Sequence, residues 1–225
     1  MDNVLSLNEI CLDIASLAAR AILYEVSCFP SPGLVSPVSS GSHDDMNYYT
    51  FIDSTFAITK YLALFANEGM KEEELSKIFL NIKKIGIKAE KAMFNSTKNV
   101  NTHKGMIFLI GICIAASSYA IYHKKDFYDI QNIIKSMCKG IVKNDFKNLE
   151  KKKKITHGEK LYLQYGTTGI RGEVEDGIPL AFNYGLDLYE NSLYLEENER
   201  LVHTLIGIMK FCDDSTVIHR TGIEG

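Results

Sequence analysis

The stretch that decides the fold is GMIFLIGICIAASSYAIY, residues 105–122. It contains no charged side chain, and it is flanked by Lys104 on one side and by His123, Lys124 and Lys125 on the other. Its length is at the lower edge of what crosses a bilayer, and no second run of this kind supports a membrane protein. We therefore expect a buried central helix.

Apolar residues recur at helical spacing on both sides of this run, and nothing alternates with period two for long enough to form a sheet. The expected helices run from the capping box Ser6-Leu7-Asn8-Glu9 to before Pro30, and then over Tyr49–Ala66, Leu75–Ala89, Met106–Tyr122, Phe127–Ile141, Thr156–Tyr165, Pro179–Asn191 and Leu201–Met209. The sequence predicts an all-α fold, a single-domain multi-helix bundle over residues 1–225.

Bulk properties narrow the class of protein. Among 225 residues, 46% are hydrophobic, and the net charge of −3 offers no general field for nucleic acid or an anionic membrane. The N-terminus lacks the pattern of a secretory signal, so we expect a cytoplasmic protein. Five widely spaced cysteines form no CxxC pair, which predicts buried thiols and neither a disulfide framework nor a zinc cluster.

The breaks between the helices carry more polar residues than simple turns need. They are Pro30–Met46, Asn99–Gly105, Gly166–Glu173 and Asp213–Gly222. Polar loops of a helical bundle can converge at one end and form a site, and we expect that here.

The first break ends in GSHDDM, residues 41–46. An imidazole and two carboxylates within three positions, His43, Asp44 and Asp45, can bind a divalent metal or orient a hydroxyl group. The alternative is structural, with Ser42 or Asp44 capping the following helix.

The second break ends in NTHKG, residues 101–105, directly before the most apolar helix. Free backbone amides at a helix start, together with Lys104, predict an anion site that suits phosphate. The alternative is that Thr102 is an N-cap and Lys104 a solvated charge.

The third break reads GTTGIRGE, residues 166–173, and its glycines would let backbone approach a ligand closely. It is not a Walker A loop, and a glycine-rich connector is the alternative. The last break pairs Asp213 and Asp214 with His219 and Arg220, unless it is a fraying terminus. Two of the four arginines, Arg171 and Arg220, lie in these breaks, which hints at recognition of phosphate oxygens.

Taken in order, Pro-Gly-Leu-Val at 32–35, Gly-Ser-His-Asp-Asp-Met, Asn-Thr-His-Lys-Gly, Gly-Ile-Arg-Gly-Glu and the closing His-Arg resemble the triphosphoribosyl-dephospho-coenzyme A synthases. The resemblance runs from about Tyr24 to Arg220. It implies transfer of the 5-triphosphoribosyl group of ATP to 3'-dephospho-coenzyme A with release of adenine. The implied product is the prosthetic-group precursor of the acyl carrier subunit of citrate lyase or malonate decarboxylase, passed on to a holo-acyl carrier transferase.

An oxocarbenium-like state at the ribose needs negative charge and a base, and a triphosphate needs cations, Mg²⁺ included. The residues that we expect to be catalytic are His43, Asp45, His103 and Glu173, with either His103 or His219 protonating adenine. The expected metal ligands are Asp44, Asp45 and Asp214. The expected substrate-binding residues are Gly33, Ser42, Asn101, Thr102, Lys104, Gly105, Gly169, Arg171, Gly172, His219 and Arg220.

Two departures from the family pattern stand out. The family loop usually reads Lys-Pro-Gly-Leu-Val-Asp-Arg, whereas Ser31 precedes Pro32 here and Ser36-Pro37 follow Val35, so one cation and one carboxylate are missing. The chain also ends at Gly225, where family members usually continue, which predicts a truncated or a compact variant. The rival functions are a metal-dependent hydrolase of nucleotides or ADP-ribose, and a non-catalytic nucleotide-binding relative.

Overall fold

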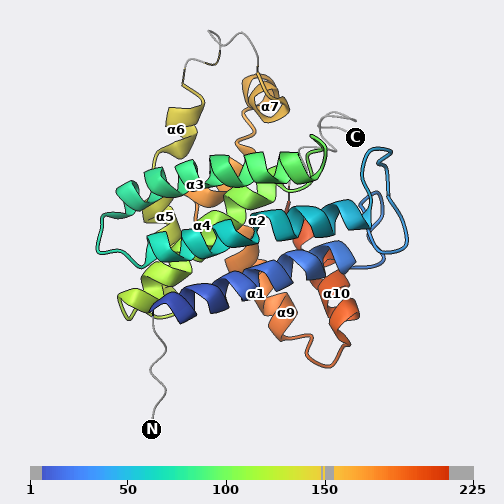
Figure 1. Cartoon of the computed structure of the whole chain (residues 1–225), viewed down its shortest axis with the longest axis horizontal. Helices are drawn as coiled ribbons and strands as arrows, with labels where there is room; N and C mark the ends of the chain where they lie inside the picture. Colours follow the sequence, from blue (N-terminus) through green and yellow to red (C-terminus); the bar gives the residue numbers. More distant parts are fainter. Residues whose placement is uncertain (1–6, 148, 150–154, 213–225) are drawn as a thin grey trace. The chain divides into compact units, whose positions relative to one another are not determined.

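The structure, a computed structural model, describes residues 7–147, 149 and 155–212 (Figure 1). The chain forms two compact units, residues 1–133 and 134–225, and each is described by itself. Within the described residues there is no β-strand, and one isolated bridge joins Ser36 and Ser39. The all-α prediction is confirmed, while the single-domain organisation stays a prediction.

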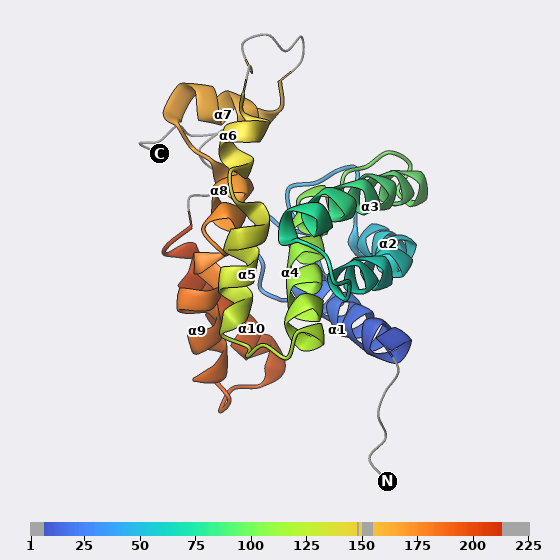
Figure 2. The same ribbon diagram turned by 90° about the vertical axis from the view of Figure 1, so that its left-hand side faces the viewer.

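Unit 1 is built from four long helices. They are α1 (Leu7–Ser27), α2 (Tyr48–Gly69), α3 (Leu75–Ser96) and α4 (Lys104–Tyr122). Helix α2 packs against the other three, and α4 also contacts α1 and α3 (Figure 2). The predicted packing around the apolar run is confirmed, as is the end of α1 before Pro30, whereas Ser6 of the predicted capping box lies outside the described residues.

Two glycines let α2 and α4 pack closely within unit 1. A methyl group on Gly69 would collide with the carbonyl oxygen of Ala115 on α4, and one on Gly111 would press on the Phe65 ring. In the part of the chain that the structure describes, α4 alone is long and apolar enough to cross a membrane. Its contacts with α1, α2 and α3 are those of a core helix, as predicted.

The expected helix over residues 127–141 forms, but it starts two residues later and ends three residues earlier than predicted. The structure has α5 (Asp129–Cys138), which spans the boundary between the units, and then a short α6 (Ile141–Asp145). Gly140 separates them with a φ of 79°, a left-handed conformation that breaks the helical path. Of the five free cysteines, Cys11, Cys28 and Cys138 are buried and Cys113 is half-buried, but Cys212 is exposed, contrary to the prediction.

Unit 2 continues with α7 (His157–Tyr165), α8 (Gly169–Glu175), the π-helical turn η2 (Ala181–Gly185), α9 (Leu186–Glu190) and α10 (Glu197–Met209). The predicted polar loop over residues 166–173 is therefore wrong in part, because its second half is helical. Gly166 ends α7 with a φ of 73°, and Val174 is fully buried, so apolar burial holds α8 in place despite its glycines. The expected helix from Pro179 forms, but with the π-helical turn inside it.

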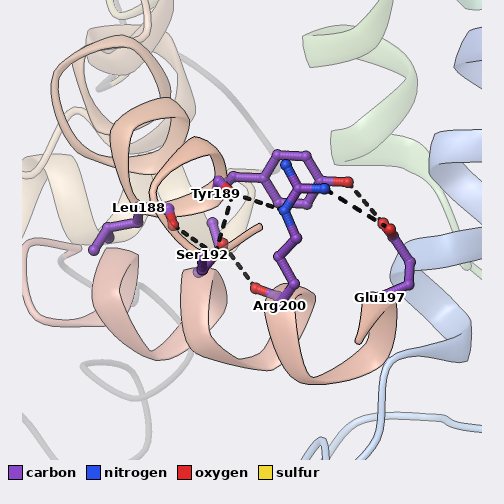
Figure 3. A network of polar contacts seen from close by, with 6 residues as sticks. Leu188, Tyr189, Ser192, Glu197 and Arg200 are labelled. Carbon is purple, nitrogen blue, oxygen red and sulfur yellow. Dashed lines mark hydrogen bonds and ion pairs between the residues drawn. The ribbon is translucent and has the colours of Figure 1, made fainter. Parts of the chain in front are cut away.

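A polar network fastens α9 to α10 (Figure 3). The Arg200 guanidinium carbon stands 3.4 Å from the centroid of the Tyr189 ring, and Arg200 Nε donates to the Tyr189 carbonyl oxygen at 2.7 Å. The Tyr189 hydroxyl donates to Glu197 Oε1 at 2.6 Å, and Ser192 Oγ donates to the Leu188 carbonyl oxygen at 2.7 Å. These contacts hold the turn between the two helices.

Candidate functional site

The polar loop before α2 is closed by its own backbone. Ser42 N donates to the Gly33 carbonyl oxygen at 3.1 Å, so these two predicted binding residues lie at the neck of the loop. Gly41 has a φ of 60°, and a side chain there would collide with the backbone of Gly33 and Leu34. The glycines of this loop therefore allow it to fold back on itself.

His43 Nδ1 lies 3.9 Å from Asp45 Oδ1, a separation of two positions along the chain. Asp44 and Asp45 are both exposed. The alternative prediction that Ser42 or Asp44 caps α2 is wrong: the N-cap is Asn47, whose Oδ1 accepts a hydrogen bond from Thr50 N at 3.1 Å. The GSHDDM side chains are therefore not used to start the helix.

Within the described residues, no three His, Cys, Asp or Glu side chains gather closely enough to hold a metal ion. Of the expected ligands, Asp44 and Asp45 lie in the loop of unit 1, and Asp214 lies outside the described residues. Metal binding by these three carboxylates stays a prediction.

His103 is a buried member of a hydrogen-bonded chain between the start of α4 and α2. Its side chain is 3% exposed, and its Nδ1 lies 2.6 Å from Ser54 Oγ. Thr102 Oγ1 donates to the same Ser54 Oγ at 2.7 Å, and the Phe51 ring meets the imidazole edge-on at 4.9 Å. The motif that was expected to face a ligand is thus tied into the packing of unit 1.

The donor and acceptor roles in this chain of hydrogen bonds set the tautomer of His103. If Ser54 accepts from Thr102 and donates to Nδ1, the imidazole proton stays on Nε2, and Nε2 is buried without a hydrogen-bond partner in the described residues. Burial lowers the pKa of His103 from 6.5 to about 4, so the ring is neutral at pH 7. A neutral His103 can donate a hydrogen bond from Nε2, but it is a weak source of a proton for adenine.

The backbone at the start of α4 is partly used. Asn101 Oδ1 accepts from Lys104 N at 3.2 Å, and His103 N lies 3.1 Å from Met93 Sδ. Thr102 as N-cap is wrong, because the N-cap position is His103 and Thr102 points to Ser54. Lys104 Nζ lies 3.3 Å from a Glu90 carboxylate oxygen, while Gly105 has open space beside it.

In unit 2, the segment 166–173 lines a hollow of about 850 Å³. Gly169, Gly172 and Glu173 are in its wall, as expected of binding residues. Glu173 Oε1 accepts from Leu180 N at 2.9 Å, which fixes the carboxylate in place. Burial raises the pKa of Glu173, and nearby Asp176 adds to the rise, so the carboxylate holds a proton more firmly than usual.

The Arg171 side chain makes contacts within the protein. Its Nε donates to Asp145 Oδ2 at 2.9 Å, and its guanidinium carbon lies 5.2 Å from the centroid of the Phe146 ring. Phe146 in turn stacks on Tyr162 at 3.9 Å. Arg171 fastens α8 to the end of α6 here, and phosphate binding by it stays a prediction.

The structure thus groups the predicted residues by unit. His219 and Arg220 lie outside the described residues, as does Asp214. The convergence of the unit 1 and unit 2 segments on one site stays a prediction. Asn183 and Tyr184 also line the hollow. These two residues and Ser54 were among those not predicted, because each lies inside a segment that reads as an ordinary helix.

The family model and the curated relatives that match this chain agree with one another. The family model of CitG, ATP:dephospho-CoA triphosphoribosyl transferase, matches residues 11–225. A "Probable 2-(5''-triphosphoribosyl)-3'-dephosphocoenzyme-A synthase" of Streptococcus equi subsp. equi is 35% identical, over 94% of this chain and 77% of that protein. One of the same name from Lactiplantibacillus plantarum is 39% identical, over 92% and 74%. "Protein CitXG" of Leuconostoc mesenteroides subsp. cremoris is 40% identical, over 93% and 46%. No solved structure matches.

Proposed function

The chain belongs to the ATP:dephospho-CoA triphosphoribosyl transferase family, and we propose that it makes 2'-(5''-triphosphoribosyl)-3'-dephospho-coenzyme A from ATP and dephospho-coenzyme A. It is a transferase, and ATP is its substrate. The observation that carries this function is the family match over residues 11–225, within which the polar motifs occur in the family's order.

The reaction exchanges one bond at the anomeric carbon of ATP for another. The 2'-hydroxyl oxygen of dephospho-coenzyme A forms a bond to that carbon, and the bond to adenine N9 breaks. The hydroxyl proton passes to a base, and adenine leaves with a proton on a ring nitrogen. Because the anomeric carbon carries positive charge in the transition state, a carboxylate close to it lowers the barrier.

We assign the carboxylate next to the ribose to Glu173. Its hydrogen bond from Leu180 N holds the side chain at the wall of a hollow large enough for a substrate group. Its raised pKa brings it nearer to the operating pH, where a general base both exists in the ionised form and accepts a proton effectively. Asp45 and His43 remain the candidates from unit 1 for the same chemistry.

The triphosphate needs positive charge to offset its own. Lys104, exposed at the start of α4, is the candidate cation of unit 1, together with the Gly105 amide. We propose that Mg²⁺ joins them, with Asp44 and Asp45 supplying oxygen ligands of the kind that this ion prefers. Both carboxylates are exposed and can reach a metal that arrives with the nucleotide.

The product has a defined destination in this proposal. It is handed to a transferase that attaches it to the acyl carrier subunit of citrate lyase, or of malonate decarboxylase. We expect a cytoplasmic location for this role.

Free adenine is the direct readout. The protein is incubated with ATP, Mg²⁺ and dephospho-coenzyme A, and adenine is followed by chromatography. Adenine should appear only when dephospho-coenzyme A is present, and removing Mg²⁺ with a chelator should stop its release. Adenine or phosphate released from ATP alone would indicate a hydrolase, and ATP binding without any product would indicate a non-catalytic relative.

A further inference from the structure

The hollow of unit 2 has two sides, and only one of them belongs to a predicted polar segment. One side is the segment from Tyr165 to Glu173, and the other is the π-helical turn η2, which contributes Asn183 and Tyr184. Phe211, just after α10, completes the wall. At about 850 Å³ the hollow has the size of an ordinary small-molecule site.

Asn183 and Tyr184 belong to the π-helical turn and line this wall. A π-helical turn widens the helix locally, is rare, and is concentrated at functional sites. Here it is held from behind, where a side chain on Gly185 would stand 3.0 Å from Ile208 Cδ1 of α10. The turn therefore packs closely on α10 with its glycine and leaves Asn183 and Tyr184 exposed.

The aromatic part of the wall is already arranged for stacking. The rings of Tyr184 and Phe211 lie 4.0 Å apart and within 10° of parallel. Tyr184 is 37% exposed and Phe211 is 46% exposed, so this stack is open to solvent. A flat heterocycle can extend such a stack, because every nucleobase has a π-face.

The charged side chains in the wall itself are acidic, and the nearby Lys210 Nζ lies over the Phe211 ring, 5.4 Å from its centroid. Glu173 and Asp176 contribute carboxylates, and no Lys, Arg or His side chain is part of the described lining. Arg171 belongs to the same motif but pairs with Asp145 instead. Carboxylates accept hydrogen bonds from ribose hydroxyls, and the Asn183 amide has the donor and acceptor pair that reads an adenine edge.

From these contacts we propose that the hollow binds the adenosine group of a substrate, base against Tyr184 and ribose beside Glu173, and leaves the phosphate chain outside. The inference rests on the proposed function, in which both ATP and dephospho-coenzyme A carry adenosine. It makes the GTTGIRGE segment, which was expected to approach a ligand closely, one wall of a nucleoside site. It also brings the anomeric carbon, which joins base and ribose, close to the Glu173 carboxylate.

Binding of adenosine itself tests the proposal, by calorimetry on the full chain with inorganic tripolyphosphate as the comparison ligand. Tyr184→Ala should weaken adenosine binding by about tenfold or more and leave tripolyphosphate binding unchanged, because a stacking partner alone is lost. Tyr184→Phe keeps the ring and should stay within about threefold of the original protein. The matched control is Tyr194→Ala, since Tyr194 is 79% exposed in the same unit and outside the hollow.

Asn183→Ala and a photoreactive 2-azidoadenosine serve in case Tyr184→Ala fails to fold, as circular dichroism would reveal. Asn183→Ala should also weaken adenosine binding, and the crosslink should fall on peptides within residues 165–184 or on Phe211. Adenosine that does not bind, affinities within about twofold in both alanine variants, or adenosine-protected labelling elsewhere would each overturn the proposal.

Steady-state kinetics separates this inference from the proposed function. A raised KM for ATP in Asn183→Ala would place the adenosine group of ATP in the hollow. A raised KM for dephospho-coenzyme A would place the adenosine group of dephospho-coenzyme A there instead. Adenine release that needs dephospho-coenzyme A, with both KM values unchanged, overturns the adenosine site alone. If the original protein releases no adenine, the proposed function fails, while the calorimetry still decides what the hollow binds.

Discussion

The His103 segment of unit 1 and the Glu173 segment of unit 2 read alike in sequence, yet the structure uses them differently. His103 is buried in a hydrogen-bonded chain with Ser54 and Thr102. Glu173 stands in the wall of an open hollow, held by one backbone amide. The difference shows that a polar motif before or within a helix can serve the packing of the protein as readily as it can bind a ligand. Whether its side chains are buried decides between these two roles.

The largest effect is expected at Glu173. Glu173→Gln keeps an acceptor for Leu180 N but removes the base, so kcat/KM for adenine release should fall by about 100-fold or more, with the melting temperature unchanged. Glu190→Gln, an exposed change in the same unit, is the control. A fall of less than about threefold in Glu173→Gln would remove Glu173 from the chemistry.

The next largest effect tests whether the hydrogen-bonded chain of His103, Ser54 and Thr102 stabilises the fold. Ser54→Ala leaves both Thr102 and His103 without their shared partner, which should lower the free energy of unfolding by about 1–3 kcal/mol in urea titrations. Ser118→Ala is the matched control, because Ser118 is equally buried and its hydroxyl has no partner within the described residues. That change should be neutral or stabilising, and equal losses in the two variants would contradict the argument.

The third prediction concerns pH. Since the pKa of His103 is lowered from 6.5 to about 4, the unfolded chain binds a proton in that interval that the folded chain does not. The free energy of unfolding should therefore fall as the pH drops from 6.5 toward 4, and this residue should account for roughly 3 kcal/mol of the loss. His103→Asn should flatten that part of the stability curve, whereas His203→Asn, at an exposed position, should leave its slope as it is.

The smallest effect is expected at Lys104, and it decides whether the His103 segment serves a ligand as well. Lys104→Ala should raise the KM for ATP by about five- to tenfold if its charge meets phosphate, and should change stability by no more than about 0.5 kcal/mol, because the pair with Glu90 is half-exposed. Lys88→Ala on α3 is the control. An unchanged KM would leave this segment with a structural role alone.

Much of the fold could be predicted because apolar residues that recur at helical spacing over a long segment are buried well only if that segment is a helix. The ends of α2 and α4 lie close to the predicted ones, whereas α3 continues to Ser96, seven residues beyond the predicted Ala89. The predicted helix over Thr156–Tyr165 forms as α7, and the structure adds a capping box between Thr156 and Glu159 at its start. The predicted helix bounds also differ from the observed ones where a glycine can either end a helix or be part of one. Gly140 breaks a helix, whereas Gly169 and Gly172 enter one, and the difference depends on whether neighbouring apolar residues such as Val174 find a place to be buried.

The site could be predicted only in outline. The segments that carry Glu173 and His103 stood out because charge and glycine were concentrated there. Asn183 and Tyr184 did not, since nothing local to residues 179–191 predicts a π-helical turn, and the close packing of Gly185 against Ile208 is visible only in the structure. Ser54 was equally hidden, because a serine within an amphipathic helix gains its role only from the partner 49 positions away.

The sequence by itself determined the helical class, the apolar run that becomes α4 and the ordered motifs by which the family is known. These depend on local periodicity and on residue identity, which are written along the chain. Only the tertiary structure decided that His103 is buried and neutral, that Arg171 is paired with Asp145, and that Glu173 faces a hollow beside two stacked rings. Burial, pairing and dielectric environment arise between residues far apart in the chain, so no local pattern contains them.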